Sequence, residues 1–151
     1  LLYPEIHVNT GNIGRTCVLT NTKLHLIKPL GFSLDAKEIR RAGLDYWKDV
    51  QLHVWEDFEH FFQENIEGKD DVKLYFATTK TNKKYTDVKF QKDDYIMFGP
   101  ESRGIPEDFL NAHKEKNITI PMLPIGRSLN LSNAVAIILY EALKQVNFEF
   151  E

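Results

Sequence analysis

The sequence predicts an α/β protein with a mostly parallel sheet flanked by helices. Short runs of apolar, β-branched or aromatic residues recur along the chain, and segments with helical or turn character separate most of them. Strands that alternate with helices form parallel sheets that are covered on both faces. The length of 151 residues and an apolar share of 42% suffice for one sizeable core, so we expect a single domain over residues 1–151.

The expected strands are residues 1–3, 24–27, 50–54, 72–77, 95–98 and 118–120. Because the first apolar run is short and begins with Leu, we expect further strand residues ahead of Leu1. Asn9 is expected to open a helix that runs to about Thr20, and Asp35 with Glu38 is typical of a capping box. A Phe-rich helix is expected over residues 56–64, and the polar segment 80–94 is expected to be a loop.

The last expected helix, residues 130–147, carries apolar residues at helical spacing: Leu131, Val135, Ile138, Leu139, Ala142, Leu143 and Val146. That stripe would cover the sheet. Its first turns are apolar on the other faces as well, through Ala134, Ala136, Ile137 and Tyr140. A helix that is apolar all round needs burial on more than one side. We therefore expect a homodimer, with an interior helix of a monomer as the alternative.

Composition excludes several classes of protein. No apolar stretch is long enough to span a membrane, and the amino-terminal residues lack a signal-peptide pattern, so we expect a soluble, cytoplasmic protein. A net charge of −3 argues against a protein that coats nucleic acid nonspecifically. The lone Cys17 is expected to be a small buried helix residue, and the five histidines show no paired ligand spacing, so no metal is expected.

Three segments place Gly, Pro, Ser, Asn or charged residues where open α/β sheets bind ligands, just after a strand. The first, residues 9–15, is interpreted as a Gly-rich turn, although its spacing matches neither a Walker nor a dinucleotide-binding motif. The second, 98–106, places Glu101 and Arg103 between glycines, and an ordinary turn with a surface ion pair is the alternative. The third, 120–133, has more Ser and Asn than a helix N-cap requires.

Together these segments resemble the SPOUT superfamily of RNA methyltransferases, and within it the small single-domain tRNA 2′-O-ribose methyltransferases of the TrmL (YibK) type. The matching motifs are Pro4-Glu5-Ile6, Asn9-Thr10-Gly11-Asn12-Ile13 with Arg15, Leu24-His25-Leu26-Ile27, Pro29-Leu30-Gly31-Phe32, Arg40-Arg41-Ala42-Gly43-Leu44-Asp45-Tyr46, residues 98–106, Ile120-Pro121-Met122 and residues 127–135 with Tyr140-Glu141-Ala142. They cover almost the whole chain, so a chance match is implausible.

The resemblance implies a fold whose carboxy-terminal segment forms a trefoil knot that binds S-adenosylmethionine. It also implies a homodimer packed through the first and last helices. The implied activity is that of an S-adenosylmethionine-dependent tRNA (cytidine(34)-2′-O)-methyltransferase, which methylates the ribose 2′-hydroxyl of the wobble nucleotide, cytidine or a modified uridine, in leucine tRNAs.

By the same resemblance, Arg15, Glu101, Ser128 and Asn130 are the expected catalytic residues, with Arg15 stabilising charge on the ribose oxygen. The expected cofactor-binding residues are Ala77, Thr78, Gly99, Pro100, Glu101, Ile120, Met122, Ser128 and Leu129. The expected tRNA contacts are Arg40, Arg41, Tyr46 and Lys80. Two alternatives remain: a SPOUT enzyme that acts on another tRNA position or on rRNA, and a non-catalytic RNA-binding or nucleotide-binding module that keeps the knot.

Overall fold

The computed structural model describes residues 1–35, 37 and 45–150. Its longer elements are α1 (His7–Leu19), β1 (Leu24–Ile27), β2 (Leu52–Trp55), α3 (Phe58–Asn65), β3 (Leu74–Ala77), β4 (Tyr95–Phe98), α4 (Glu107–Ala112), β5 (Asn117–Ile118) and α5 (Leu131–Gln145). Three short 3₁₀ turns, η1 (Asp45–Asp49), η2 (Tyr85–Asp87) and η3 (Lys114–Lys116), lie between them.

All named strand pairs are parallel. β1 pairs with β2, and β3 lies between β4 and β5. The segment ahead of α1 joins these two parts: the N–H of Leu2 donates to the carbonyl oxygen of Phe98 at 2.8 Å, and the carbonyl oxygen of Leu1 accepts from the N–H of Ile27 at 2.9 Å. The order across the molecule is therefore β2, β1, residues 1–3, β4, β3, β5.

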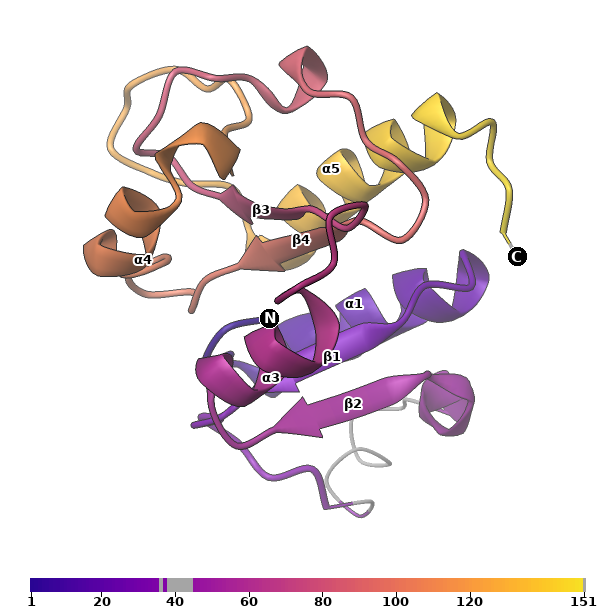
Figure 1. Cartoon of the computed structure of the whole chain (residues 1–151). Helices are drawn as coiled ribbons and strands as arrows, with labels where there is room; N and C mark the ends of the chain where they lie inside the picture. The colour runs from indigo at the N-terminus through magenta and orange to yellow at the C-terminus, as the bar shows by residue number, and fades with distance from the viewer. Residues whose placement is uncertain (36, 38–44, 151) are drawn as a thin grey trace.

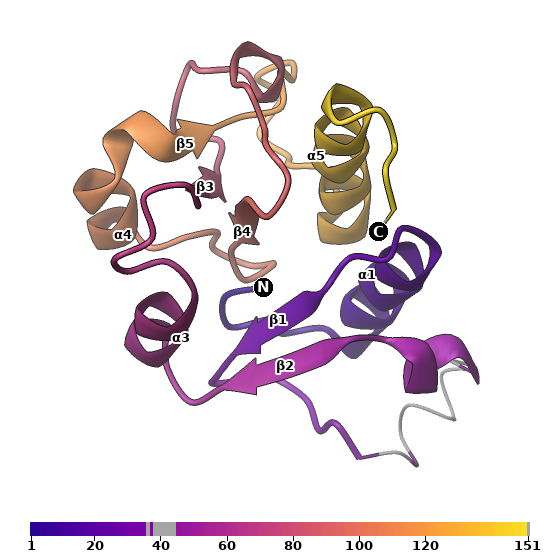
Figure 2. The same ribbon diagram turned by 45° about the vertical axis from the view of Figure 1, so that its right-hand side comes forward.

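Helices cover both faces of this sheet, with α1 and α5 side by side on one face and α3 and α4 on the other (Figures 1 and 2). Alternating strand residues face the two layers: Tyr75 packs in the cluster beneath α1 and α5, whereas Leu74 and Phe76 pack in the cluster beneath α3 and α4. A strand buried on both faces is apolar at consecutive positions, which explains the unbroken apolar run in β3.

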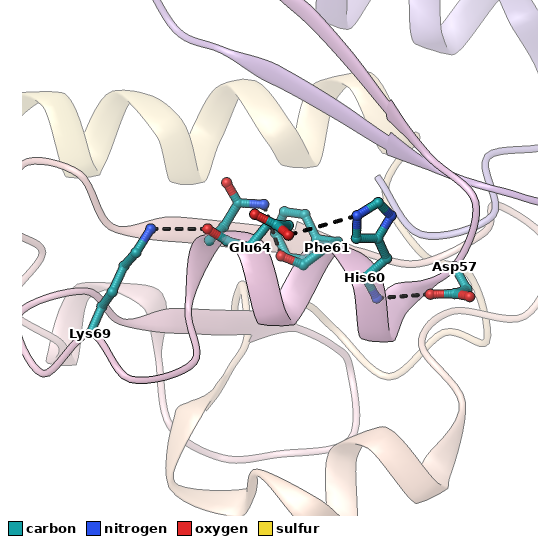
Figure 3. A network of polar contacts seen from close by, with 6 residues as sticks. Asp57, His60, Phe61, Glu64 and Lys69 are labelled. Atoms are coloured by element: carbon teal, nitrogen blue, oxygen red, sulfur yellow. Dashed lines mark hydrogen bonds and ion pairs between the residues drawn. The ribbon is translucent and has the colours of Figure 1, made fainter.

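The α3 helix shows how local sequence sets a boundary. The side chain of Asp57 accepts a hydrogen bond from the N–H of His60 at 2.8 Å and so caps the first turn, as Figure 3 shows. Glu64 lies 3.9 Å from His60, and its carbonyl oxygen accepts from Lys69 Nζ at 3.0 Å (Figure 3). Phe61 is 2% exposed and packs α3 against the sheet, in the cluster with Leu74 and Phe76.

The alternation of parallel strands and helices confirms the predicted α/β class. Cys17 is buried in α1, as predicted. Four of the expected strands and three of the expected helices are present, with ends that differ by a few residues. Segment 1–3 forms an isolated bridge to β1, and the expected strand 118–120 is the shorter β5. Glu38 of the expected capping box lies outside the described residues.

Two expectations were wrong in detail. Residues 9–15 are not a Gly-rich turn, because α1 already begins at His7 after Ile6. Gly14 lies inside this helix, where a Cβ atom would come within 2.7 Å of the Trp47 ring, so close helix packing explains this glycine. The short α4, with Pro106 preceding it, was not predicted; its six residues are too few to show a helical period.

Candidate active site at the carboxyl edge of the sheet

Five of the predicted cofactor-binding residues, Ala77, Thr78, Gly99, Pro100 and Ile120, lie at or just after the carboxyl ends of β3, β4 and β5. In register, Ala77 at the end of β3 lies opposite Phe98 of β4 and Ile118 of β5. Thr78, Gly99 and Ile120 follow these strand ends directly or closely, and the N–H of Thr78 donates to the Ile118 carbonyl oxygen at 2.9 Å. Carboxyl ends of neighbouring parallel strands are where open α/β sheets bind ligands.

The loop after β4, residues 98–106, folds tightly on itself. The N–H of Gly104 donates to the carbonyl oxygen of Pro100 at 2.8 Å, and Pro100 is fully buried. A Cβ atom on Gly99 would lie 2.3 Å from the carbonyl carbon of Gly104, a distance that no side chain permits. Gly104 has φ of +69°, which favours glycine. Close backbone approach within the loop therefore requires Gly99, and the positive φ favours glycine at position 104.

Glu101 occupies the tip of this loop and binds the start of α1. Its Oε1 accepts from the N–H of Glu5 at 2.9 Å, and its Oε2 accepts from the N–H of Ile6 at 2.8 Å and from Asn9 Nδ2 at 3.2 Å. A carboxylate at a helix N-terminus satisfies N–H groups that lack partners inside the helix. Glu101 therefore supplies the cap that Ile6 cannot provide with its own side chain.

Asn9 extends this network to α5. The side chain of Asn9 is 7% exposed, and its Oδ1 accepts from Asn130 Nδ2 at 3.1 Å. Asn130 in turn caps α5, since its Oδ1 accepts from the N–H of Ser132 at 2.9 Å. Two of the predicted catalytic residues, Glu101 and Asn130, are thus connected through a residue to which the sequence analysis assigned no role.

The segment that leads into α5 is open to solvent. Every residue of 121–130 is exposed, including the predicted site residues Met122, Ser128 and Leu129. Met122 and Leu129 are each 39% exposed, and Leu123 reaches 78%. Ile120 is the exception among the predicted residues in this part of the chain, because it packs against the core beneath α1 and α5.

Arg15 lies apart from this network. It is six residues after Asn9, which corresponds to about 9 Å along the axis and roughly 240° around it, and its side chain is exposed whereas that of Asn9 is buried. Its guanidinium lies 5.7 Å from the centre of the Tyr46 ring. Tyr46 donates a hydrogen bond to the Gly11 carbonyl oxygen at 3.0 Å, and desolvation by burial raises its pKa. Within one chain, the structure does not bring Arg15 to Glu101.

The structure describes two of the four predicted tRNA contacts, Lys80 and Tyr46. Lys80 forms an ion pair with Glu107 at 2.9 Å, and this hydrogen bond, together with the lysine charge, lowers the pKa of Glu107. Tyr46 lies beside α1. Arg40 and Arg41 lie outside the described residues.

A cavity of about 670 Å³ lies elsewhere, between the two parts of the sheet and the carboxy-terminal half of α5. None of the predicted site residues lines it. Within residues 1–35, 37 and 45–150, no helix is long and apolar enough to cross a membrane. The described part of the chain also holds no group of three or more His, Cys, Asp or Glu side chains that would suit a metal ion.

Comparison with known proteins identifies the class to which this fold and sheet edge belong. The chain belongs to the SpoU rRNA Methylase family, which matches residues 1–140. It is 44% identical to the tRNA (cytidine(34)-2′-O)-methyltransferase of Escherichia coli K12, over 98% of this chain and 92% of that protein.

Solved structures agree. A structure described as giving insights into the 2-OH methylation of C/U34 on tRNA is 38% identical and superposes with a TM-score of 0.87, covering 97% of this chain and 93% of that one. The SpoU methyltransferase AviRb from Streptomyces viridochromogenes, solved in complex with the cofactor AdoMet, has a TM-score of 0.80 at 20% identity and covers 97% of this chain and 56% of that one. At 20% identity, the similarity to AviRb shows a shared fold and no more.

Proposed function

We propose that this protein transfers a methyl group from S-adenosylmethionine to the ribose 2′-hydroxyl of the wobble nucleotide, cytidine or a modified uridine at position 34, in leucine tRNA. The observation that carries the proposal is the 44% identity, over nearly the full chain, to an enzyme named for methylation of cytidine 34. The structure supports it through the network that holds Glu101 and Asn130 at the sheet edge.

The sheet edge suits S-adenosylmethionine, which would supply a methyl group on a positively charged sulfur. Ala77, Thr78, Gly99, Pro100 and Ile120 lie together there, and none of these five residues carries a charged side chain. Their neutral hydrogen-bonding groups match an adenine ring. The exposed segment with Met122, Ser128 and Leu129 lies directly after Ile120 and would complete the pocket.

This chain's own residues would hold the substrates and stabilise charge. Methyl transfer needs an in-line approach of the ribose oxygen to the methyl carbon, so positioning supplies much of the rate. As the new O–C bond forms, the sulfur–carbon bond breaks and the hydroxyl proton is released to solvent. A guanidinium is unsuited to act as a base, because arginine side chains are not deprotonated in proteins. We assign Arg15 the stabilisation of negative charge on the ribose oxygen.

A homodimer packed through α1 and α5 is part of the proposal. The two helices pack side by side, and their outer faces expose apolar side chains: Val8 at 50%, Leu19 at 66%, Ile137 at 36% and Tyr140 at 45%. Apolar surface of this kind is stabilised by burial against a second subunit. Arg15 lies between Val8 and Leu19 on this face, so dimer formation would take it from solvent into the interface.

Three further features belong to the same proposal. One domain carries the activity. Its carboxy-terminal segment forms a knot, as the resemblance to the SPOUT superfamily implies. A crystal structure in which residues 119–131 are traced tests the knot. Lys80, Tyr46, Arg40 and Arg41 are proposed as tRNA contacts. A tRNA substrate places the protein in the cytoplasm, which microscopy of a tagged chain tests.

The deciding experiment is methyl transfer from radiolabelled S-adenosylmethionine to tRNA that lacks the modification, followed by nuclease mapping of the labelled ribose. Label in 2′-O-methylcytidine or 2′-O-methyluridine at position 34 is the expected result. Label at another tRNA position or in rRNA would support the alternative substrate. Cofactor binding without any incorporation would support a non-catalytic RNA-binding module.

A further inference from the structure

A second carboxylate, Glu5, faces the loop after β4, and its contacts mirror those of Glu101. The N–H of Ser102 donates to Glu5 Oε1 at 2.8 Å, and Ser102 Oγ donates to Glu5 Oε2 at 3.0 Å. In the opposite direction, the N–H of Glu5 donates to Glu101 Oε1. Each segment therefore gives its carboxylate to the backbone of the other, and we call this arrangement the reciprocal lock.

The reciprocal lock acts at the tip of the loop. The base of the loop is fixed by the contact of Gly99 with Gly104 and by the hydrogen bond between Gly104 and Pro100. These contacts do not reach the tip of the loop. Ser102 is exposed there, and neither Ser102 nor Glu5 belongs to either apolar cluster. Residues 101 and 102 are oriented by their hydrogen bonds with Glu5 and Ile6 and by the bond that Asn9 donates to Glu101.

We propose that Glu5 is a positioning residue that holds the loop 98–106 in its cofactor-binding conformation by fixing Ser102. This inference rests on the proposed function. A loop that is already ordered in the free protein binds its ligand more tightly, because binding does not have to supply the free energy of ordering the loop. The two hydrogen bonds from Ser102, followed by the nearby charge of Arg103, lower the pKa of Glu5, so its carboxylate is ionised at neutral pH and accepts both bonds.

The test compares Glu5→Ala and Glu5→Gln with the wild-type protein. Calorimetry measures the Kd of S-adenosylhomocysteine, the unreactive product. All proteins are measured at one temperature, at which each of them is folded. For Glu5→Ala we expect the Kd and the KM for S-adenosylmethionine to rise about tenfold, which is about 1.4 kcal/mol. The KM for tRNA and kcat at saturating cofactor should change less than about twofold. Glu5→Gln keeps one acceptor for Ser102 and should recover part of the affinity.

Glu56→Ala is the matched control, because Glu56 is also an exposed carboxylate and contacts only the side chain of Lys28 in its ion pair, at 3.0 Å. It should leave the Kd unchanged. Amide hydrogen exchange in the free protein gives an independent measurement: exchange at Ser102 should become faster in Glu5→Ala and remain as in the wild type in Glu56→Ala.

Wild-type affinity in Glu5→Ala would overturn the inference, as would a lowered melting temperature with an unchanged Kd or an equal rise in both KM values. These results leave the proposed function intact. Failure of the wild-type protein to bind S-adenosylhomocysteine would instead overturn the proposed function, and with it any cofactor role for Glu5. Exchange at Ser102 would then still report whether the lock orders the loop.

Discussion

Asn9 and Asn130 are joined by a hydrogen bond of 3.1 Å between their side-chain amides, one near the start of α1 and the other capping α5. Because Asn9 also donates to Glu101, this one side chain connects the loop after β4 to the last helix. The first and last helices and the loop at the sheet edge therefore form one hydrogen-bonded unit.

Asn9→Ala should weaken activity more than it weakens the fold. The substitution removes the acceptor of Asn130 Nδ2 and one of the two hydrogen bonds to Glu101 Oε2, and loss of a partner in a partly buried site costs about 1–3 kcal/mol. We expect single-turnover methylation to fall by roughly 5- to 100-fold. Asn111→Ala, on the exposed side of α4, is the control and should retain the wild-type rate. Equal rates in the two variants would contradict this role.

Arg15→Ala should reduce the chemical step without reducing cofactor affinity, because Arg15 lies away from the loops at the sheet edge and is proposed to act on the ribose oxygen. Loss of one charge-stabilising group typically lowers kcat by about 10²- to 10³-fold. Arg15→Lys keeps the charge and should retain part of the rate. Rapid-quench measurement of one turnover checks both, and near-full activity of Arg15→Ala would refute the assignment.

Ile137→Glu should convert the proposed dimer into monomers. Ile137 is exposed on the outer face of α5, where a partner subunit would bury it, and an unpaired buried carboxylate is strongly unfavourable. Light scattering coupled to size-exclusion chromatography should show half the wild-type mass. Asn111→Glu places the same charge on the exposed side of α4 and should leave the mass unchanged. A wild-type protein that is already monomeric would exclude the dimer.

His25 should make the protein less stable in acid. Burial, followed by the charge of His53, lowers the pKa of His25 from 6.5 to about 3, and Trp55 Nε1 donates to its Nδ1 at 3.0 Å. The folded state therefore binds fewer protons on His25 than the unfolded state does. The stability that this provides is fully present above about pH 6.5 and is lost as the pH falls toward 3.

We expect the melting temperature to fall by several degrees between pH 7 and pH 5, which is about 1–2 kcal/mol after allowance for partial exposure of the ring. In His25→Gln, which keeps an acceptor for Trp55, this part of the pH dependence should disappear. His113→Gln, also a half-buried ring in the described structure, serves as the control. The same slope in His25→Gln as in the wild type would show that other groups cause the effect.

The sequence predicted the parallel α/β class because unbroken apolar runs such as that of β3 are typical of buried parallel strands. The short α4 has too few residues to show a helical period. The start of α1 was not predicted because Ile6 has no capping side chain and its N–H binds Glu101 instead. The motifs located Glu101 and Asn130, but their connection through Asn9 and the pairing of Glu5 with Ser102 join residues far apart in the chain. No local pattern reports such contacts.

Residues 1–3 are synthesised before the strands β1 to β5, yet they lie in the middle of the finished sheet. During translation they can pair with β1 early, but their other neighbour does not exist until Phe98 has left the ribosome. Until then the nascent chain carries an unpaired apolar strand edge, the kind of surface on which misassembly begins. The order of synthesis thus leaves the centre of the sheet open until β4 has emerged, after β1, β2 and β3.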